Sequence, residues 1–136
     1  MGRNSRKARR LLVGDERYLW SVGHDHRVGG IQSGRFQGCP GYQGCRDLVI
    51  IRRLGARGRL VLSFPGGPGR RVSDGRGAGG VVGSQESGWL NLHEPGTVRA
   101  LLDEALAGGW QPGDPAAWET DGWVFFDTVA ARRTAR

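Results

Sequence analysis

The length of 136 residues fits one domain, and an apolar content of 38% together with 25 glycines provides for only a modest hydrophobic core. Two cysteines are too few for the disulfide framework of a small secreted protein. No apolar run approaches the roughly 20 residues of a membrane helix, and the run at 11–13 is too short for a secretory signal. We therefore expect a cytoplasmic protein without a membrane partner.

The formal net charge of +7 is concentrated at the two ends of the chain. Residues 1–10 carry +5 and residues 132–136 carry +3, which leaves −1 for the body between them. In this body, residues 11–95 have a net charge of +4 and residues 96–131 a net charge of −5, so we expect the two parts to attract each other. Short basic chain ends are often unconstrained, although in some proteins they bind nucleic acid.

The first predicted elements are two strands of a hairpin, at 10–13 and 17–22, with Gly14 and Asp15 in the turn. Alternate residues of the second strand are large and apolar, which predicts that they face the core. These residues are Tyr18, Trp20 and Val22.

Residues 23–46 are rich in Gly, Gln and Arg, so we interpret them as a loop, with Ile31 as the candidate for a short third strand. The clearest strand pair follows at 48–51 and 60–64, joined by turn residues at 55–58. The first of these strands is apolar at four successive positions, which predicts a central strand covered on both faces. The second alternates apolar residues onto one side.

The segment at 65–80 has a low-complexity composition with almost nothing to bury, and it predicts a mobile loop. Short strands are expected at 81–82 and 89–92, before the only stretch with a helical pattern.

That helix is predicted at 95–107, with Pro95 in the first helical position, where its missing N–H and fixed φ are well tolerated. Gly108 and its neighbour permit the left-handed turn that ends such a helix, Trp110 folds back over the last turn, and Pro112 prevents the helix from resuming. One apolar stripe with helical spacing forms the buried face. It consists of Val98, Leu101, Leu102, Ala105 and Leu106.

Residues 112–121 are interpreted as irregular and residues 123–126 as a last strand. Strands, one helix and a final strand predict an α+β fold, a mainly antiparallel β-sheet with one principal helix packed on a face. We divide the chain into a disordered basic tail at 1–9, a single α+β domain at 10–128 and a second basic tail at 129–136.

Metal-binding residue types occur in the first loop. His24 and His26 have spacing that permits a shared ion, with Cys39, Cys45 or His93 as further ligands. The two cysteines are separated by more residues than in a zinc knuckle, so solvated turn histidines and unrelated thiols are the simpler interpretation. We predict no cofactor.

Eight basic residues are candidates for nucleic-acid or anion binding. They lie in the N-terminal tail and in the 65–80 loop: Arg3, Arg6, Lys7, Arg9, Arg10, Arg70, Arg71 and Arg76. The loop follows a predicted strand, as phosphate-binding turns do, but it lacks the G-x-x-x-x-G-K-[ST] and G-x-G-x-x-G patterns. No helix follows whose N-terminus would receive a phosphate, so a flexible loop is the default interpretation.

No residue lies in a motif of nucleophilic or metal-assisted catalysis such as G-x-S-x-G or H-E-x-x-H. Asp103, Glu104, Asp121 and Asp127 are interpreted as solvated surface acids. Four tryptophans near the helix and last strand are predicted to belong to the core and its cover, not to a platform for stacking bases. These are Trp89, Trp110, Trp118 and Trp123.

The hairpin sequence Arg17-Tyr18-Leu19-Trp20 and the segment Asn91-Leu92…Pro95…Val98…Ala105…Gly109-Trp110-x-Pro112 resemble a group of small uncharacterised proteins common in actinobacteria. Such proteins usually have Thr or Ser before the proline, where this chain has Glu94, a poorer helix cap. The resemblance implies a fold and no activity.

The sequence therefore favours an interaction or accessory module without catalytic activity, whose partner is another protein. Its expected working surface is the open sheet face with the loops at 23–46 and 65–80. Nucleic-acid or anion binding through the arginine-rich tails and loop is the first alternative. A small metal-binding protein or enzyme that uses His24, His26 and His93 is the second.

Overall fold

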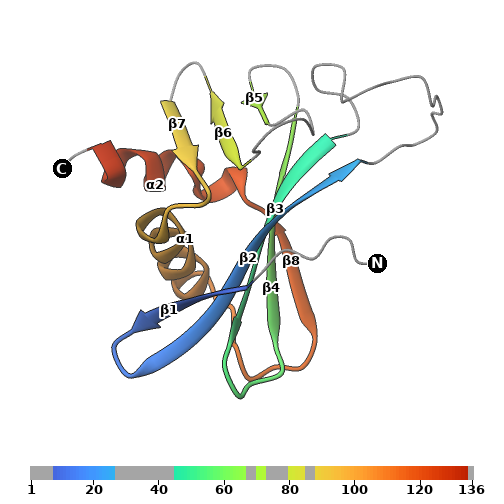
Figure 1. Ribbon diagram of the computed structural model, residues 1–136, viewed down its shortest axis with the longest axis vertical. Coiled ribbons are helices and arrows are strands. Elements are labelled where there is room, and N and C mark those ends of the chain that lie inside the picture. The colour runs from blue at the N-terminus through green and yellow to red at the C-terminus, as the bar shows by residue number, and fades with distance from the viewer. Residues whose placement is uncertain (1–7, 27–44, 67–69, 73–79, 85–87, 135–136) are drawn as a thin grey trace.

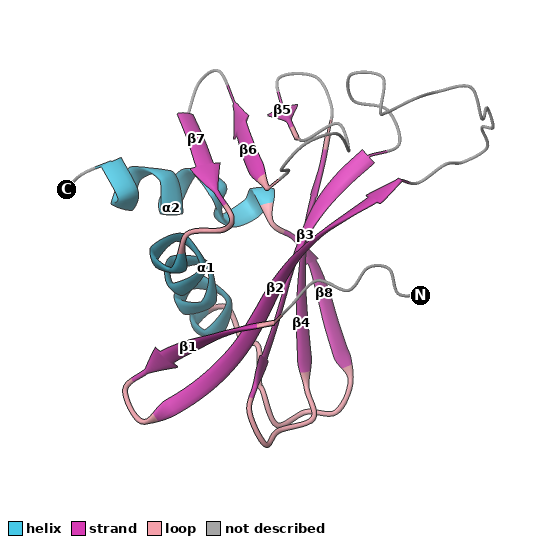
Figure 2. Cartoon of the chain, in the orientation of Figure 1, coloured by secondary structure: helices cyan, strands magenta, loops and turns pink. Residues whose placement is uncertain are grey.

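Two sheets and two helices make up the fold in a computed structural model, which describes residues 8–26, 45–66, 70–72, 80–84 and 88–134 (Figure 1). The five-stranded sheet has the order β1 (Arg9–Val13), β2 (Glu16–His26), β3 (Cys45–Arg53), β4 (Arg59–Pro65) and β8 (Ala117–Asp121). The three-stranded sheet has the order β5 (Arg70–Arg71), β6 (Val81–Ser84) and β7 (Gly88–Asn91). The helices are α1 (Pro95–Ala107) and α2 (Trp123–Thr134). Strands and helices in this combination confirm the predicted α+β class (Figure 2).

Strands β1 to β4 form an antiparallel meander, as the sequence predicts. The first hairpin closes at Val13 and Glu16, and Gly14 in its turn has a φ of +61°, in the region that glycine occupies without strain. The long β2 pairs with β3 from Tyr18 to His26. Strand β8 then lies parallel to β4 at the far edge of the sheet. The other three described strand pairs of this sheet are antiparallel.

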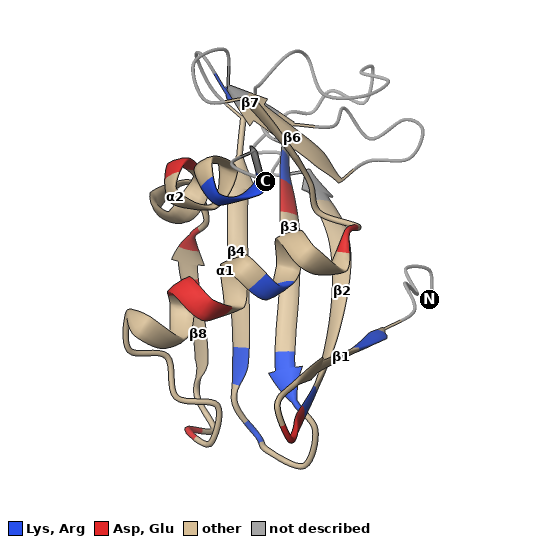
Figure 3. Cartoon of the chain, turned by 90° about the vertical axis from the view of Figure 1, so that its left-hand side faces the viewer, with Lys and Arg blue, Asp and Glu red and all other residues tan. Residues whose placement is uncertain are grey.

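Both helices lie on the same face of the five-stranded sheet, and the views in Figure 1 and Figure 3 agree on this arrangement. The side chains on this face are almost wholly buried. They are Tyr18, Trp20 and Val22 from β2, Val49 and Ile51 from β3, and Leu60, Leu62 and Phe64 from β4. The central position of β3 is as predicted, but cover on both faces is not, because Leu48 and Ile50 on the outer face are only half-buried.

Helix α1 has the predicted bounds, with Pro95 at its start. Four residues of its predicted stripe are fully buried and Leu106 is half-buried. At its end Gly109 has a φ of +115°, which lets the Trp110 N–H donate to the Ala105 carbonyl oxygen over 3.0 Å. The Trp110 side chain is buried in the hydrophobic core.

The end of the chain differs from the prediction in two elements. Residues 117–121, expected to be irregular, form strand β8, and residues 123–126, expected to be a strand, begin helix α2. The Asp121 carboxylate accepts a hydrogen bond from the Trp123 N–H over 3.0 Å, which satisfies a backbone donor of the first helical turn. Trp123, Phe126 and Ala130 are all buried, so the helical period continues beyond the apolar run that suggested a strand.

Three predicted boundaries are also corrected. The loop expected at 23–46 is strand at both its ends, and residues 27–44, with Ile31 and Cys39, lie outside the described residues. In the segment at 65–80, Arg70–Arg71 form β5, and the expected mobility of 67–69 and 73–79 concerns residues outside the described ones. The tail expected at 129–136 is helical as far as Thr134, because α2 continues there.

Candidate functional site

A histidine and a buried carboxylate face each other near the end of the β2–β3 ladder. His24 and Asp47 are directly opposite in the register, and the His24 Nδ1 lies 2.7 Å from an Asp47 carboxylate oxygen. The Asp47 side chain is fully buried, and the His24 side chain is 13% exposed. With the proton on Nδ1, the imidazole donates to the carboxylate and its orientation is fixed. The pair thus links the two longest strands and holds a ring that is still partly accessible.

General acid–base catalysis by this pair would need a nucleophile beside it, and metal coordination would need further ligands. His93 lies in different surroundings, with its ring packed against Gly80 and its backbone N–H bonded to the Asn91 side chain over 2.9 Å. The strand register places His26 opposite Cys45. Among the described side chains, no group of three His, Cys, Asp or Glu residues has metal-binding geometry.

Burial raises the pKa of the Tyr18 phenol above its ordinary value, and the nearby positive charge of Arg53 partly offsets this effect. A phenol with a raised pKa remains protonated at neutral pH. Its burial places Tyr18 in the hydrophobic core.

The arginines predicted to bind anions are placed in separate parts of the fold. Arg9 lies in β1, where its guanidinium is 4.6 Å from the centre of the Trp20 ring and donates to the His93 carbonyl oxygen over 2.8 Å. Arg70 in β5 lies 5.0 Å from the centre of the Trp123 ring. Arg10 is exposed on β1. Arg3, Arg6, Lys7 and Arg76 lie outside the described residues, and of Arg71 the structure describes the backbone.

The Trp123 ring, which lies under the Arg70 guanidinium, is itself held in place by residues of β4. The indole packs edge-on against Phe64 with 5.4 Å between ring centres, and its N–H donates to the Pro65 carbonyl oxygen over 2.8 Å. The ring is thus fixed beside β4 and offers its face to the guanidinium, an attractive cation–π arrangement. Arg9 over Trp20 repeats this arrangement at the other end of the sheet.

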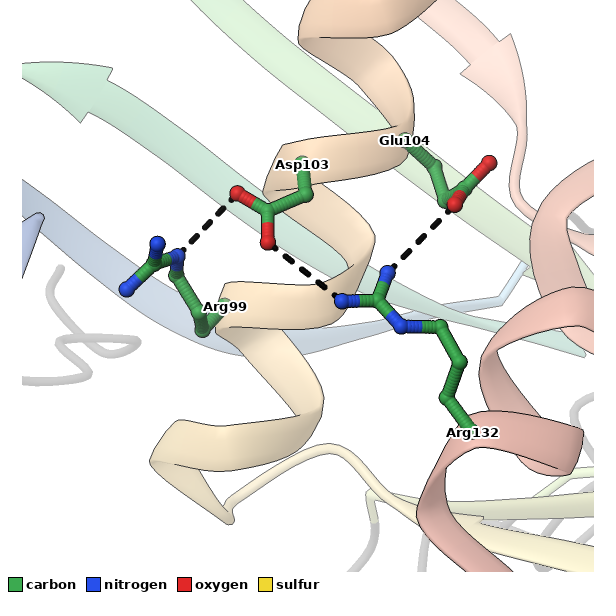
Figure 4. Close-up of polar contacts among 4 residues, drawn as sticks. All are labelled: Arg99, Asp103, Glu104 and Arg132. Atoms are coloured by element: carbon green, nitrogen blue, oxygen red, sulfur yellow. Dashed lines mark hydrogen bonds and ion pairs between the residues drawn. The ribbon is translucent and has the colours of Figure 1, made fainter. Parts of the chain in front are cut away.

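The acids of α1 are partnered by arginines, contrary to the prediction of solvated acids. The Asp103 carboxylate forms ion pairs with the guanidinium of Arg99 in the same helix at 3.0 Å and with that of Arg132 in α2 at 3.5 Å (Figure 4). Glu104 lies 3.4 Å from the other terminal nitrogen of Arg132. One guanidinium therefore bridges two acids on the neighbouring helix.

Two further ion pairs link other parts of the fold. Arg133, at the end of α2, contacts Glu94 in front of α1 at 3.0 Å. On the outer face of the large sheet, Arg46 contacts Glu119 of β8 at 3.0 Å. The latter pair joins the basic and acidic parts of the body, as their opposite charges predict.

Among the residues that the structure describes, the most exposed aromatic side chain is that of Trp89 in β7, which is 58% exposed. Its side chain lies over Gly83 of the neighbouring strand, so closely that a Cβ atom at Gly83 would overlap the indole. Val81, also on the outer face of β6, is 44% exposed. We call the surface formed by Val81, Gly83 and Trp89 the Trp89 patch.

Sequence reasoning also missed the exposure of Trp89 and the burial of Asp47. Trp110 and Trp123 are buried and Trp118 is half-buried, but Trp89 does not belong to the core. A signal existed for both. Alternation within 89–92 places Leu90 and Leu92 on one face and therefore Trp89 on the other, and alternation with Val49 and Ile51 places Asp47 on the buried face.

No protein family, curated protein or solved structure matches this chain. Within the described ranges, no helix is long and apolar enough to cross a bilayer.

Proposed function

We propose that the protein is an interaction module that binds a partner protein through the Trp89 patch. The observation that carries the proposal is Trp89 itself, a large side chain that is 58% exposed while its ring lies against Gly83. Tryptophan is enriched among the residues that dominate binding energy in protein interfaces. Its burial by a partner removes a large apolar area from water.

The glycine beneath the ring adds to this argument. Because Gly83 has no side chain, the indole packs on the backbone of β6 instead of projecting freely into solvent. A side chain already held in one orientation loses less conformational entropy on binding than a free one. The Trp89 patch therefore combines exposed apolar area with preorganisation.

Four of the described arginines already have internal partners, which makes these four poor candidates for contacts to nucleic acid. Arg9 and Arg70 lie over tryptophan rings, and Arg132 and Arg133 are paired with acids of α1 or its N-terminus. A phosphate backbone would compete with these internal contacts. Nucleic-acid binding by the remaining basic residues stays a prediction, which salt dependence tests because phosphate contacts weaken steeply with ionic strength.

The test is affinity capture from cells of the native host, with bound proteins quantified for the wild type, Trp89→Ala and Leu12→Ala. Leu12 is a matched control because it is an apolar strand residue that is 64% exposed on β1. We expect a partner whose recovery falls at least about tenfold with Trp89→Ala and is unchanged with Leu12→Ala. Equal recovery with all three proteins would contradict the proposal.

A further inference from the structure

We propose that a second copy of this chain pairs with the free edge of β7, which joins two three-stranded sheets across a two-fold axis. The inference rests on the proposed function, since it names a partner of the Trp89 patch. In Figure 1, β7 is the outermost strand of its sheet, and β6 is its one neighbour in the described sheet order.

The hydrogen-bond pattern identifies which backbone groups of β7 point outward. The Leu92 N–H donates to the Gly80 carbonyl oxygen over 2.7 Å, immediately beyond the pair Val81–Asn91. Hydrogen-bonded and non-hydrogen-bonded pairs alternate in an antiparallel ladder, so Leu90 and Gly88 bond to β6. The N–H and C=O groups of Trp89 and Asn91 therefore point away from β6.

One of these four groups has an internal partner, because the Asn91 carbonyl oxygen accepts from the Glu94 N–H over 3.0 Å. For the Trp89 N–H, the Trp89 C=O and the Asn91 N–H, no hydrogen-bond partner is found within the described part of the chain. Backbone groups of this kind at a sheet edge are a template for another strand.

The charges of the edge strands indicate that the added strand comes from a second copy and that it pairs with β7. In a symmetric pairing about a two-fold axis, each edge strand lies against its own copy, so a charged edge brings like charges together. Each of the other described edge strands carries charges of one sign: Arg9 and Arg10 in β1, Glu119 and Asp121 in β8, Arg70 and Arg71 in β5. Strand β7 has the sequence Gly-Trp-Leu-Asn and no charge.

Figure 3 shows this contrast directly, because β6 and β7 carry neither blue nor red. Among the described edge strands, β7 is thus the one that is compatible with itself. It also carries the exposed tryptophan, whereas charged residues protect the other edges from self-pairing.

The outward groups define the register of the proposed pair. With the two-fold axis beside Trp89, each Trp89 N–H donates to the Trp89 carbonyl oxygen of the other copy. Directly opposite residues in such a pair lie about 5.5 Å apart at their Cα atoms. The pairing therefore satisfies four backbone groups, two from each copy.

The test is sedimentation velocity on the full chain from about 1 to about 500 μM, where mass action shifts a monomer–dimer equilibrium. We expect the wild type to dimerise with rising concentration. Trp89→Asp, which removes the ring and places like charges opposite each other, should weaken dimerisation at least about tenfold. Leu12→Asp on β1 is the matched control and should dimerise like the wild type.

Circular dichroism and thermal unfolding establish that the variants are folded, and Trp89→Thr, a polar strand-forming residue, replaces Trp89→Asp if the latter is not. A wild type that stays monomeric at every concentration would overturn the inference. So would dimerisation that the Trp89 variants leave intact. A monomeric wild type whose captured partner is still lost with Trp89→Ala would overturn the second copy alone and leave the proposed function standing.

Discussion

The inner faces of the two sheets contribute to one core, but their outer faces differ. On the inner side, Val49 and Leu62 of the large sheet and Val82 of the small sheet are all fully buried. On the outer side, the large sheet carries the Arg46–Glu119 ion pair, half-buried aliphatic residues and the exposed Leu12, whereas the small sheet exposes an aromatic residue, Trp89.

The difference between the inner and outer faces distinguishes residues that stabilise the fold from residues that are available for binding. An inner-face residue is explained by the stability that its burial provides, about 25 cal/mol per Å² of apolar surface. An exposed tryptophan gains little of this stability in the isolated chain, so its presence is explained better by a contact with another molecule.

The largest effect is expected for Leu101→Ala in α1, because Leu101 is fully buried between the helix and the sheets. Loss of a buried leucine side chain costs about 3–5 kcal/mol of unfolding free energy, which urea denaturation measures. Trp89→Ala should cost less than about 1 kcal/mol despite the larger side chain. Similar losses from both substitutions would show that the Trp89 patch belongs to the core after all.

A smaller loss is expected for Asp47→Ala, which leaves His24 without the carboxylate that orients it. Hydrogen bonds to charged groups contribute about 1.5–3 kcal/mol, so the unfolding free energy should fall by that amount. His24→Ala should show a comparable loss, and the double variant should lose less than the sum of the two. Additive losses in this double-mutant cycle would mean that the pair does not act as a unit.

At Gly122 and at Gly83, an added Cβ atom would overlap an aromatic ring, which is buried at the first position and exposed at the second. At Gly122 an added Cβ would meet the ring of Phe64, which is fully buried and cannot move away, so Gly122→Ala should cost about 1–3 kcal/mol. At Gly83 it would meet the exposed Trp89 indole, which can swing into solvent. Thermal unfolding should therefore show the larger decrease for Gly122→Ala.

Gly83→Ala has a second expected consequence. Displacement of the indole from β6 should weaken self-association in sedimentation velocity, while Gly122→Ala should leave it unchanged wherever the protein is folded. A Gly83→Ala variant with normal self-association and normal stability would show that the ring position is unimportant.

The smallest effect is expected for Arg132→Gln, which removes the contacts to Asp103 and Glu104. All three side chains are partly exposed, so solvent screening limits the loss of unfolding free energy to about 0.2–1 kcal/mol. The loss should diminish when NaCl is raised from about 0.05 to about 1 M. Arg10→Gln is the control, since no ion pair to Arg10 is found among the described residues.

Elements with local signals could be predicted from the sequence, and those that depend on distant partners could not. Helix α1 has a proline start, one apolar stripe and a glycine end, and the first hairpin has its turn residues between alternating strands. Strand β8 has no such signal, because its pairing with β4 joins residues more than 50 positions apart in the chain. The run Trp123–Phe126 is apolar throughout, and a short apolar run does not distinguish a strand from a buried helix.

The same holds for the candidate sites. The arginine-rich sequence suggested anion binding, yet the internal partners of Arg9 and Arg70 are tryptophans that the fold brings to them. The position of Trp89 near the helix predicts a place in the core or its cover, although the alternation of its strand places it on the outer face. Residue type alone therefore did not predict which partners these side chains have or how exposed they are.

Alone, the sequence determined the α+β class, the bounds of α1 and the inward faces of β2 and β4, because hydrophobic period and turn chemistry act within a few residues. The tertiary structure decided the parallel edge strand, the helical end of the chain and the partners of the charged residues. It also decided that Trp89 lies outside the core beside an uncharged sheet edge. These features depend on which distant segments meet, and no local pattern encodes that meeting.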